Sequence, residues 1–258
     1  MMIEYKAKRV ILADDNQTFL MYMGILLKRL GYMVLPVKNG LEVLKLLKFC
    51  EPDVIIIDIW MEGMNGTSIL RFIKEDSLTS HIPVIMVSSD ASSAIIKKCK
   101  NLGCTGYLKK PVKVDKLHDA LEMCVFTKKK RKRKHLRVSV TKKVMVVCKG
   151  IQYSLYTEDL SEKGVYIRKR DPFPVGSQVE VLLPLDDGES MRLKGVVIHV
   201  KELLEDVFNV PPGMGIEFKK VSASHSNILK KYIKRLIGED IVESQEEYII
   251  DLSIEDPL

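Results

Sequence analysis

The stretch Val54-Ile55-Ile56-Ile57-Asp58 is an uninterrupted run of β-branched residues that ends on a carboxylate. A second apolar run, Val84-Ile85-Met86-Val87, stops at Ser88. Short apolar runs without polar alternation are typical of strands that are buried on both faces. The two runs therefore predict central strands of a parallel sheet, each followed or ended by a polar side chain.

Three weaker strand signals accompany these runs, at residues 9–13, 34–35 and 107–108. Apolar residues recur at helical spacing between and after the five strands. Five repeats of a strand followed by a helix predict an α/β doubly wound parallel five-stranded sheet, covered by helices on both faces. The expected helices lie at about 17–30, 40–49, 66–75, 91–101 and 114–125.

The pattern changes in the second half of the chain, where turn residues separate strand-like stretches with no long helix between them. One amphipathic helix follows, from about Ser224 to Ile237. This order predicts a small antiparallel sheet or β-barrel with a C-terminal helix, and the barrel is the form that we expect. The expected strands are 142–149, 151–157, 164–168, 178–184, 191–200 and 214–219.

Charge is distributed unevenly along the 258 residues, whose formal net charge is +7. Residues 128–137 hold eight basic and no acidic groups, whereas the last 21 residues hold eight acidic and no basic groups. So many like charges cannot be buried together, so the basic block marks a domain junction. We expect a doubly wound domain at 1–127, a basic linker at 128–137, a barrel domain at 138–238 and an acidic tail at 239–258.

Composition argues against several classes of protein. The apolar runs stop far short of the roughly 20 residues that a membrane span needs, and Asp14 and Asp15 interrupt the first run where a signal peptide would stay apolar. Five cysteines without a C-x-x-C pair fit reduced thiols better than disulfides or a zinc site. We therefore expect a cytoplasmic protein.

Polar side chains stand at the ends of four of the expected parallel strands. The carboxyl ends of such strands meet at one edge of the sheet, where ligands bind. Three carboxylates in one crevice repel each other unless a hard cation such as Mg²⁺ lies between them, and an ammonium and a hydroxyl suit a phosphoryl group. Any one of these residues taken alone is better explained as a solvated turn residue or a helix N-cap. They are Asp14, Asp15, Asp58, Ser88 and Lys110.

These residues stand in motifs that resemble the receiver domain of bacterial two-component response regulators. The resemblance covers residues 8–126 and rests on Leu12-Ala13-Asp14-Asp15-Asn16, on Asp58 to Gly66, on Ser88, and on Tyr107-Leu108-Lys109-Lys110-Pro111. It implies a phosphorelay protein whose partner is a cognate sensor histidine kinase or phosphotransfer protein. It also implies these roles: Asp58 as phospho-acceptor, Asp14, Asp15 and Asp58 as Mg²⁺ ligands, Ser88 and Lys110 as phosphoryl ligands, and Tyr107 as a switch that rotates.

Three positions depart from the usual receiver pattern. Glu62 stands where proline is usual, Ser88 where threonine is common, and bulky Trp60 follows two residues after the acceptor. None of these changes removes a reacting group. We expect Trp60 and Asp90 to influence how fast the phosphoaspartate hydrolyses, in a direction that the residues do not fix. A simple surface aromatic is an equally good interpretation of Trp60.

Two spaced motifs follow the basic block. Arg133-x-x-x-Arg137 ends it, and Asp159-x-Ser161-x-x-Gly164 comes about twenty residues later. With Pro211 to Phe218, these motifs resemble the PilZ domain, which binds the bacterial second messenger cyclic di-GMP; the resemblance covers about 131–238. It implies that Arg133 and Arg137 clamp the dinucleotide and that Asp159, Ser161 and Gly164 line the barrel surface beneath it. Arginine suits this ligand because it can pair with guanine, stack on its plane and neutralise phosphate.

The function that we expect is integration of phosphorylation at Asp58 with cyclic di-GMP binding, to control an output protein that the sequence does not name. The alternative is a phosphorylation-controlled nucleic-acid-binding regulator that uses the basic block on phosphate backbones, although no base-reading element such as a helix-turn-helix is visible. A metabolic enzyme is the third class. The five histidines show no metal-ligand spacing, so we expect no catalysis beyond self-directed phosphotransfer and autodephosphorylation.

Overall fold

The computed structural model describes residues 8–125, 135–185, 188–201 and 211–238. The described chain forms two compact units. The first runs from strand β1 to helix α5, and the second from strand β6 to helix α6. Arg133, with the rest of the basic block up to residue 134 and the acidic tail, lies outside the described residues.

A five-stranded, wholly parallel sheet forms the centre of the first unit, in the order β2-β1-β3-β4-β5. This is the doubly wound fold that the sequence predicts. The two uninterrupted apolar runs become β3 and β4, and every residue of both strands is buried. The strands are β1 Lys8–Ala13, β2 Tyr32–Val37, β3 Val54–Asp58, β4 Val84–Ser88 and β5 Gly106–Lys109.

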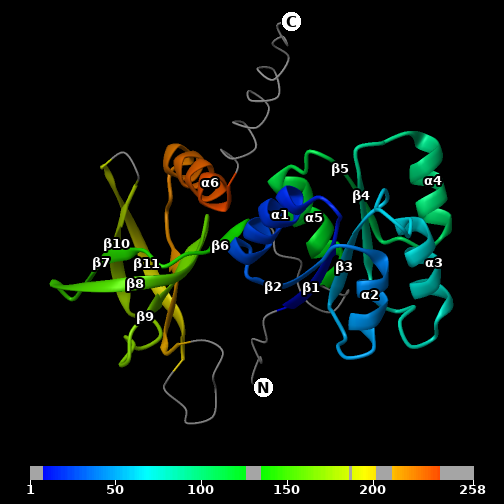
Figure 1. The fold of residues 1–258 in the computed structure, drawn as a ribbon. Helices are drawn as coiled ribbons and strands as arrows, with labels where there is room; N and C mark the ends of the chain where they lie inside the picture. The colour runs from blue at the N-terminus through cyan, green and yellow to red at the C-terminus, as the bar shows by residue number, and fades with distance from the viewer. Residues whose placement is uncertain (1–7, 126–134, 186–187, 202–210, 239–258) are drawn as a thin grey trace, which may run out of the picture. The chain divides into compact units, whose positions relative to one another are not determined.

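Helices cover both faces of this sheet, with α1 and α5 on one side and α2, α3 and α4 on the other (Figure 1). Asparagine side chains cap the first three helices by accepting hydrogen bonds from backbone N–H groups of the first turn. The N-cap of α1 is Asn16, so capping does not account for Asp14 or Asp15. The helices are α1 Gln17–Arg29, α2 Gly40–Leu47, α3 Gly66–Glu75, α4 Ser93–Asn101 and α5 Val114–Val125.

The edge strand β2 is longer than the two residues, 34–35, that its sequence suggests. It runs from Tyr32 to Val37 and includes Pro36. Proline has no N–H to donate, but an edge strand has one side free of ladder hydrogen bonds and tolerates it. The apolar signal is weak because this strand is only partly buried.

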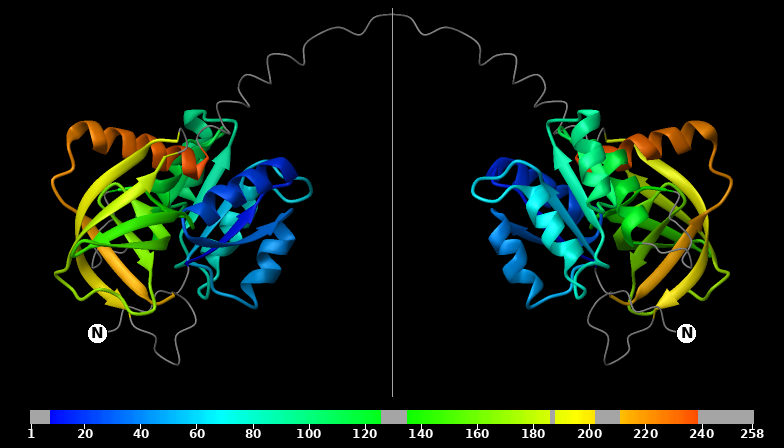
Figure 2. Two further views of the ribbon diagram at one scale, coloured as in Figure 1. Left: turned by 90° about the vertical axis from the view of Figure 1, so that its left-hand side faces the viewer. Right: turned by 90° about the vertical axis from the view of Figure 1, so that its right-hand side faces the viewer.

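An antiparallel barrel forms the second unit, as predicted. Its strands are joined in the order β8-β7-β10-β11-β12-β9, and pairing of β9 with β8 closes the ring. Figure 2 shows these strands curving around one interior. The strands are β6 Arg137–Ser139, β7 Lys143–Cys148, β8 Ile151–Ser161, β9 Gly164–Arg168, β10 Gln178–Pro184, β11 Ser190–Lys201 and β12 Gly213–Phe218.

Two features of the barrel differ from the sequence-based expectation. Strand β8 continues beyond residue 157 to Ser161, and the short strand β6 pairs with this extension. The extension is hidden in the sequence because a β-bulge at Glu158 places two polar residues in succession, which breaks the alternation by which a strand is recognised. As a result, the Asp159-x-Ser161 motif lies on a strand rather than in a turn.

The barrel strands alternate between buried apolar and more exposed residues, so one face lines the core and the other faces outward. Helix α6, Ala223–Ile237, adds Leu229, Tyr232 and Ile233 to the buried set, and the Tyr232 hydroxyl donates to the carbonyl oxygen of Pro184 at 3.1 Å. Within the described ranges, no helix is both long and apolar enough to cross a membrane.

Candidate functional sites on the sheet and the barrel

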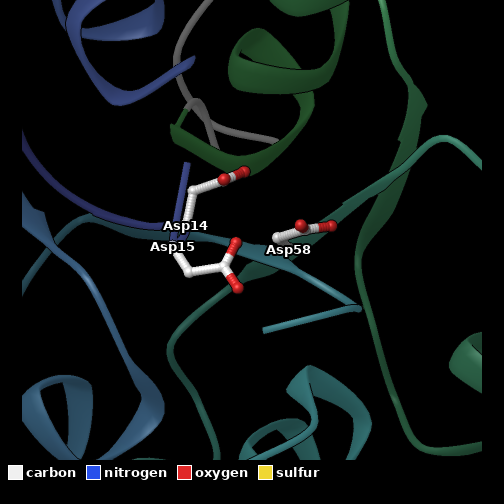
Figure 3. A group of neighbouring side chains, drawn as sticks. All are labelled: Asp14, Asp15 and Asp58. Carbon is white, nitrogen blue, oxygen red and sulfur yellow. The ribbon is translucent and has the colours of Figure 1, made fainter. Parts of the chain in front are cut away.

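Three aspartates converge at the carboxyl ends of the neighbouring strands β1 and β3. From β1 the chain continues to β2 on one side of the sheet, and from β3 it continues to β4 and β5 on the other, so this edge is the point where ligands bind in such sheets. Asp14 and Asp15 follow β1, and Asp58 is the last residue of β3. One carboxylate oxygen from each residue lies within 4.8 Å of those from the other two, and Figure 3 shows the three side chains side by side. Asp14 and Asp58 are buried, whereas Asp15 is exposed to solvent.

Lys110 binds two of these carboxylates. Its Nζ lies 2.6 Å from Oδ2 of Asp14 and 3.0 Å from Oδ2 of Asp58. The ammonium also lies 4.1 Å from the centre of the Phe19 ring, a cation–π contact. Lys110 directly follows β5, and its backbone N–H donates to the carbonyl oxygen of Ser88. The expected lysine therefore reaches the expected carboxylates from the far strand of the sheet.

Burial raises the pKa of the Asp14 carboxyl above its ordinary value, because a charge is costly to keep away from water. The hydrogen bond and positive charge of Lys110 act in the opposite direction, as does the backbone N–H of Asn16, which donates to Oδ1 of Asp14 at 2.9 Å. Burial is the larger effect. The site thus holds a buried carboxylate whose charge is only partly compensated by its present neighbours.

Asp15 is held in a different way. Its Oδ2 accepts a hydrogen bond from the backbone N–H of Glu62 at 2.9 Å. A proline at position 62 has no N–H and could not make this bond. Glu62, which reads in the sequence as a departure from the usual receiver pattern, therefore supplies a donor that orients one carboxylate of the group.

Ser88 and Tyr107 hydrogen-bond each other and the Asp90 backbone, and no described hydrogen bond joins them to the three carboxylates. Ser88 ends β4, is fully buried, and accepts a hydrogen bond from the backbone N–H of Asp90 through its Oγ. The Tyr107 hydroxyl donates to the carbonyl oxygen of Asp90, and partial burial raises the Tyr107 pKa. Both side chains thus meet the same backbone segment after β4. Trp60 is 57% exposed on the segment after β3.

Gly66 allows helix α3 to begin against the end of β3. A Cβ at this position would lie 2.0 Å from the carbonyl oxygen of Asp58, far inside van der Waals contact. The Gly66 N–H donates to the carbonyl oxygen of Ile59 at 2.9 Å. The close approach fixes the backbone that carries the Asp58 carboxylate.

The second motif group lies on the barrel, where cross-strand pairing brings its members together. Arg137 pairs with Ser161, and Ser161 pairs with Gly164 across the β8–β9 hairpin. Asp159, two residues before Ser161, lies in the neighbouring row; its Oδ2 lies 3.8 Å from a guanidinium nitrogen of Arg137. The structure thus brings together four of the five expected ligand residues, and the fifth, Arg133, lies outside the described residues.

Gly164 has a steric reason to be glycine. A Cβ here would lie 2.4 Å from the carbonyl oxygen of Ile216 on β12. Its own carbonyl oxygen accepts a hydrogen bond from the Ser161 hydroxyl at 3.1 Å. Asp159 has a partner that the sequence does not reveal: the Ser139 hydroxyl donates to its Oδ1 at 2.7 Å.

Comparison with known proteins matches each half of the chain to a family. A model of the response regulator receiver domain matches residues 10–122, and a model of the PilZ domain matches residues 131–235. The polar-differentiation response regulator DivK of Brucella anthropi is 30% identical over 115 residues, which are 94% of that protein and 45% of this chain. The chain belongs to the response regulator receiver family. Its second unit is a PilZ domain.

Other relatives of this response regulator also match its receiver half. The DivK protein of Brucella ovis is 29% identical over 115 residues, again 94% of that protein and 45% of this chain. Among solved structures, the chemotaxis response regulator CheY4 of Vibrio cholerae is 26% identical, with a TM-score of 0.43 and coverage of 45% of this chain and 98% of that one.

The receiver residues are chemically suited to a hard divalent cation. Carboxylate oxygens are the ligands that Mg²⁺ prefers, and Asp14, Asp15 and Asp58 are the one group of potential metal ligands among the described residues. Asp14 is fully buried and its charge is incompletely compensated. A cation at this position would relieve the repulsion among the three carboxylates.

The remaining candidate groups in the response regulator have ordinary structural surroundings. All five cysteines are free thiols, and burial raises the pKa of Cys104 and Cys124 to about 11. His81 lies 2.9 Å from Glu51. The thiols of Cys104 and Cys124 therefore remain protonated at neutral pH and are poor nucleophiles and metal ligands.

Proposed function

We propose that this response regulator accepts a phosphoryl group on Asp58 and binds cyclic di-GMP on its PilZ barrel, so that one protein responds to a histidine kinase and to a second messenger. The observation that carries the first part is the convergence of Lys110 with three carboxylates at one edge of the sheet. The family membership of both units supports the combination.

In the proposed phosphotransfer, an oxygen of Asp58 attacks the phosphorus of a phosphohistidine on the partner. An O–P bond forms, the N–P bond breaks, and the histidine nitrogen keeps the electron pair and takes up a proton. Asp14, Asp15 and Asp58 would hold Mg²⁺, which when bound neutralises charge on the transferring group.

Lys110 and Ser88 complete the phosphoryl site. The Lys110 ammonium lies 3.0 Å from Oδ2 of Asp58, so it is near enough to pair with an oxygen of a phosphoryl group carried by that carboxylate. The Ser88 hydroxyl accepts a hydrogen bond from the backbone N–H of Asp90 and also hydrogen-bonds the Tyr107 side chain, and it would turn to donate to another phosphoryl oxygen. Tyr107 lies beside Ser88 and is suited to change position when Ser88 binds the phosphoryl group. We propose no catalysis beyond this transfer and the hydrolysis of the phosphoaspartate, in which water takes the phosphoryl group and the Asp58 carboxylate is restored.

Cyclic di-GMP is the ligand that the barrel residues fit. The Asp159 carboxylate can accept hydrogen bonds from the N1 and N2 donors of guanine, and Arg137 can pair with the base or neutralise phosphate. Gly164 lets the dinucleotide approach the backbone. By the same motif we propose Arg133 as the second clamping arginine. The two motif groups carry two functions, and each can be tested without disturbing the other.

The receiver function is tested by intact-mass spectrometry after incubation with Mg²⁺ and a small phosphodonor such as acetyl phosphate. The wild type should gain one phosphoryl group and Asp58→Asn none. Asp53→Asn is the matched control, because Asp53 lies at the opposite end of β3 and pairs with Lys8. Phosphoryl transfer to Asp58→Asn at the wild-type level would refute the assignment.

The barrel function is tested by isothermal titration with cyclic di-GMP. The wild type should bind, and Arg137→Ala and Asp159→Ala should bind at least about tenfold more weakly, since each loses charge-assisted hydrogen bonds. Arg192→Ala is the control, because Arg192 is an exposed arginine of the same barrel that pairs with Glu180 instead. No binding by the wild type, or equal binding by all four proteins, would refute the proposal.

A further inference from the structure

A row of outward-facing positions crosses five strands of the barrel and includes the Asp159 motif residue. Cross-strand pairing places each member directly beside the next. The row alternates with buried residues of the same strands, so it lies on the outside of the barrel. Its members, from β6 to β11, are Ser139, Asp159, Tyr166, Gly215 and His199.

Two aromatic rings extend the row beyond the motif. The ring centres of Tyr166 and His199 lie 5.7 Å apart, with their planes at 40°. They stand on β9 and β11, separated by β12, where Gly215 occupies the position between them. A Cβ at Gly215 would lie 2.6 Å from Nδ1 of His199, so glycine leaves the space that the imidazole occupies.

Tyr166 is held in place without being buried in the core. Its hydroxyl donates to the carbonyl oxygen of Pro211 at 2.9 Å, which anchors the far end of the ring. The residue is half-buried and His199 is exposed, so solvent reaches both rings. Partial burial, with the nearby charges of Glu158 and Asp159, raises the pKa of Tyr166 to about 12, so the hydroxyl remains a donor at neutral pH.

Rings on the outside of a barrel contribute nothing to its core, and a fixed aromatic surface suits a flat partner. Purine bases stack on aromatic side chains, and a ring that is already fixed loses little entropy when it binds. Tyr166 stands directly opposite Asp159, at a cross-strand spacing of about 5 Å. A base that lies on the Tyr166 ring therefore has its edge within reach of the Asp159 carboxylate.

We propose that Tyr166 and His199 form an aromatic shelf on which one guanine base of cyclic di-GMP stacks, while Asp159 accepts hydrogen bonds from the N1 and N2 edge of that base. This inference rests on the proposed ligand and extends its site by two strands. The shelf contributes affinity for any purine, whereas Asp159 selects guanine, because adenine does not offer the same pair of donors.

The first test compares cyclic di-GMP affinity among three variants by isothermal titration. Tyr166→Leu removes the ring and should weaken binding about tenfold or more, the effect of losing one base–aromatic stack. Tyr166→Phe keeps the ring and loses only the bond to Pro211, so it should stay within about threefold of the wild type. Tyr153→Leu is the control, because this half-buried tyrosine packs on Phe173, about 20 Å along β8 from Asp159.

A second readout separates stacking from a structural effect. Stacking on an aromatic ring shifts the guanine H8 proton resonance upfield, so this shift should appear with the wild type and with Tyr166→Phe and be reduced with Tyr166→Leu. His199→Ala changes an exposed side chain that adds no core packing, and it should weaken binding several-fold. Circular dichroism will show whether Tyr166→Leu folds. If it does not, His199→Ala still tests the shelf.

The outcomes distinguish the shelf from the function on which it rests. If the wild type binds and Arg137→Ala does not, but Tyr166→Leu and His199→Ala bind within about twofold of the wild type with unchanged H8 shifts, the shelf is wrong and the proposed function stands. If the wild type does not bind, both are wrong. A loss of affinity in Tyr153→Leu equal to that in Tyr166→Leu would also overturn the shelf.

Discussion

Replacement of Lys110 by methionine tests the electrostatic account of the receiver site. Methionine matches the length of the aliphatic part of lysine but removes the ammonium that contacts Asp14 at 2.6 Å and Asp58 at 3.0 Å. Asp14 is fully buried, and after the change it keeps only the backbone N–H of Asn16 as a described hydrogen-bond donor. The buried carboxylate then lacks its nearest positive charge.

The magnitude of the effect follows from this geometry. Removing one partner of a buried ion pair costs about 3–5 kcal/mol. Lys110 is partly exposed, and Asp14 can bind a proton in its absence, so we expect the lower end, about 3 kcal/mol, for the receiver unit. This corresponds to a fall in the unfolding midpoint on the order of 10 °C.

The assay follows the fluorescence of Trp60 during urea unfolding in EDTA at neutral pH. Trp60 is the sole tryptophan of the chain and belongs to the receiver unit, so its signal reports that unit alone. The matched control is Lys109→Met, because Lys109 is exposed and should change the free energy of unfolding by less than about 0.5 kcal/mol.

Addition of Mg²⁺ sharpens this experiment. A cation at 100 times its dissociation constant stabilises the folded state by about 2.7 kcal/mol, and Lys110→Met should gain more than the wild type at equal Mg²⁺ because no ammonium competes for the carboxylates. Unfolding of Lys110→Met at the same urea concentration as Lys109→Met would contradict the proposed role of the ammonium. Failure of Mg²⁺ to stabilise either protein would show that the negative charge of the three carboxylates is already compensated.

Three further substitutions test other parts of the account. Asp14→Asn should stabilise the receiver at neutral pH, because burial raises the pKa of this carboxyl; the gain should shrink as the pH falls through the raised folded-state pKa and be lost below 3.8, where the folded and unfolded states are both protonated. Gly66→Ala should destabilise the receiver by about 1–3 kcal/mol, because its Cβ meets the carbonyl oxygen of Asp58. Ser139→Ala should weaken cyclic di-GMP binding about three- to tenfold, because Asp159 loses the donor that orients it.

Each of these predictions has its own measurement and contrary result. Urea unfolding between pH 4 and 8 measures the free energy of unfolding of Asp14→Asn and of the wild type. A difference between the two that does not change with pH would contradict this prediction. Urea unfolding also tests Gly66→Ala. The control is Gly24→Ala, because a Cβ at Gly24 would meet open space. Gly63→Ala is a poor control because Gly63 has a positive φ. Isothermal titration with cyclic di-GMP tests Ser139→Ala, and Ser139→Thr, which keeps the hydroxyl, should bind like the wild type. Tighter binding by Ser139→Ala would show that the serine competes with the ligand for Asp159.

The arrangement of the receiver site could be predicted from the sequence because parallel strands align their carboxyl ends. The buried runs that end at Asp58 and Ser88 place those side chains at one edge by topology alone. The sequence could not show that Lys110 already bonds to Asp14, because this contact joins residues that are 96 positions apart. Nor could it show the role of Glu62, since a backbone N–H leaves no trace in the residue type.

The barrel was less predictable, for a local physical reason. Strand recognition depends on alternation, and the bulge at Glu158 interrupts it at the point where the motif begins. The last residues of β8 and the short β6 were therefore missed, and with them the contact from Ser139 to Asp159. The placement of Tyr166 and His199 on either side of Gly215 depends on the strand register, which residue spacing alone does not determine.

One measurement tests the central claim, that a single protein takes both inputs. Native mass spectrometry of the wild type with Mg²⁺, acetyl phosphate and cyclic di-GMP should show molecules that carry a phosphoryl group and the dinucleotide together. Asp58→Asn should lose only the phosphoryl mass, and Asp159→Ala should lose only the dinucleotide. A wild-type spectrum that lacks either modification, or an Asp58→Asn spectrum that retains the phosphoryl group, would contradict the account.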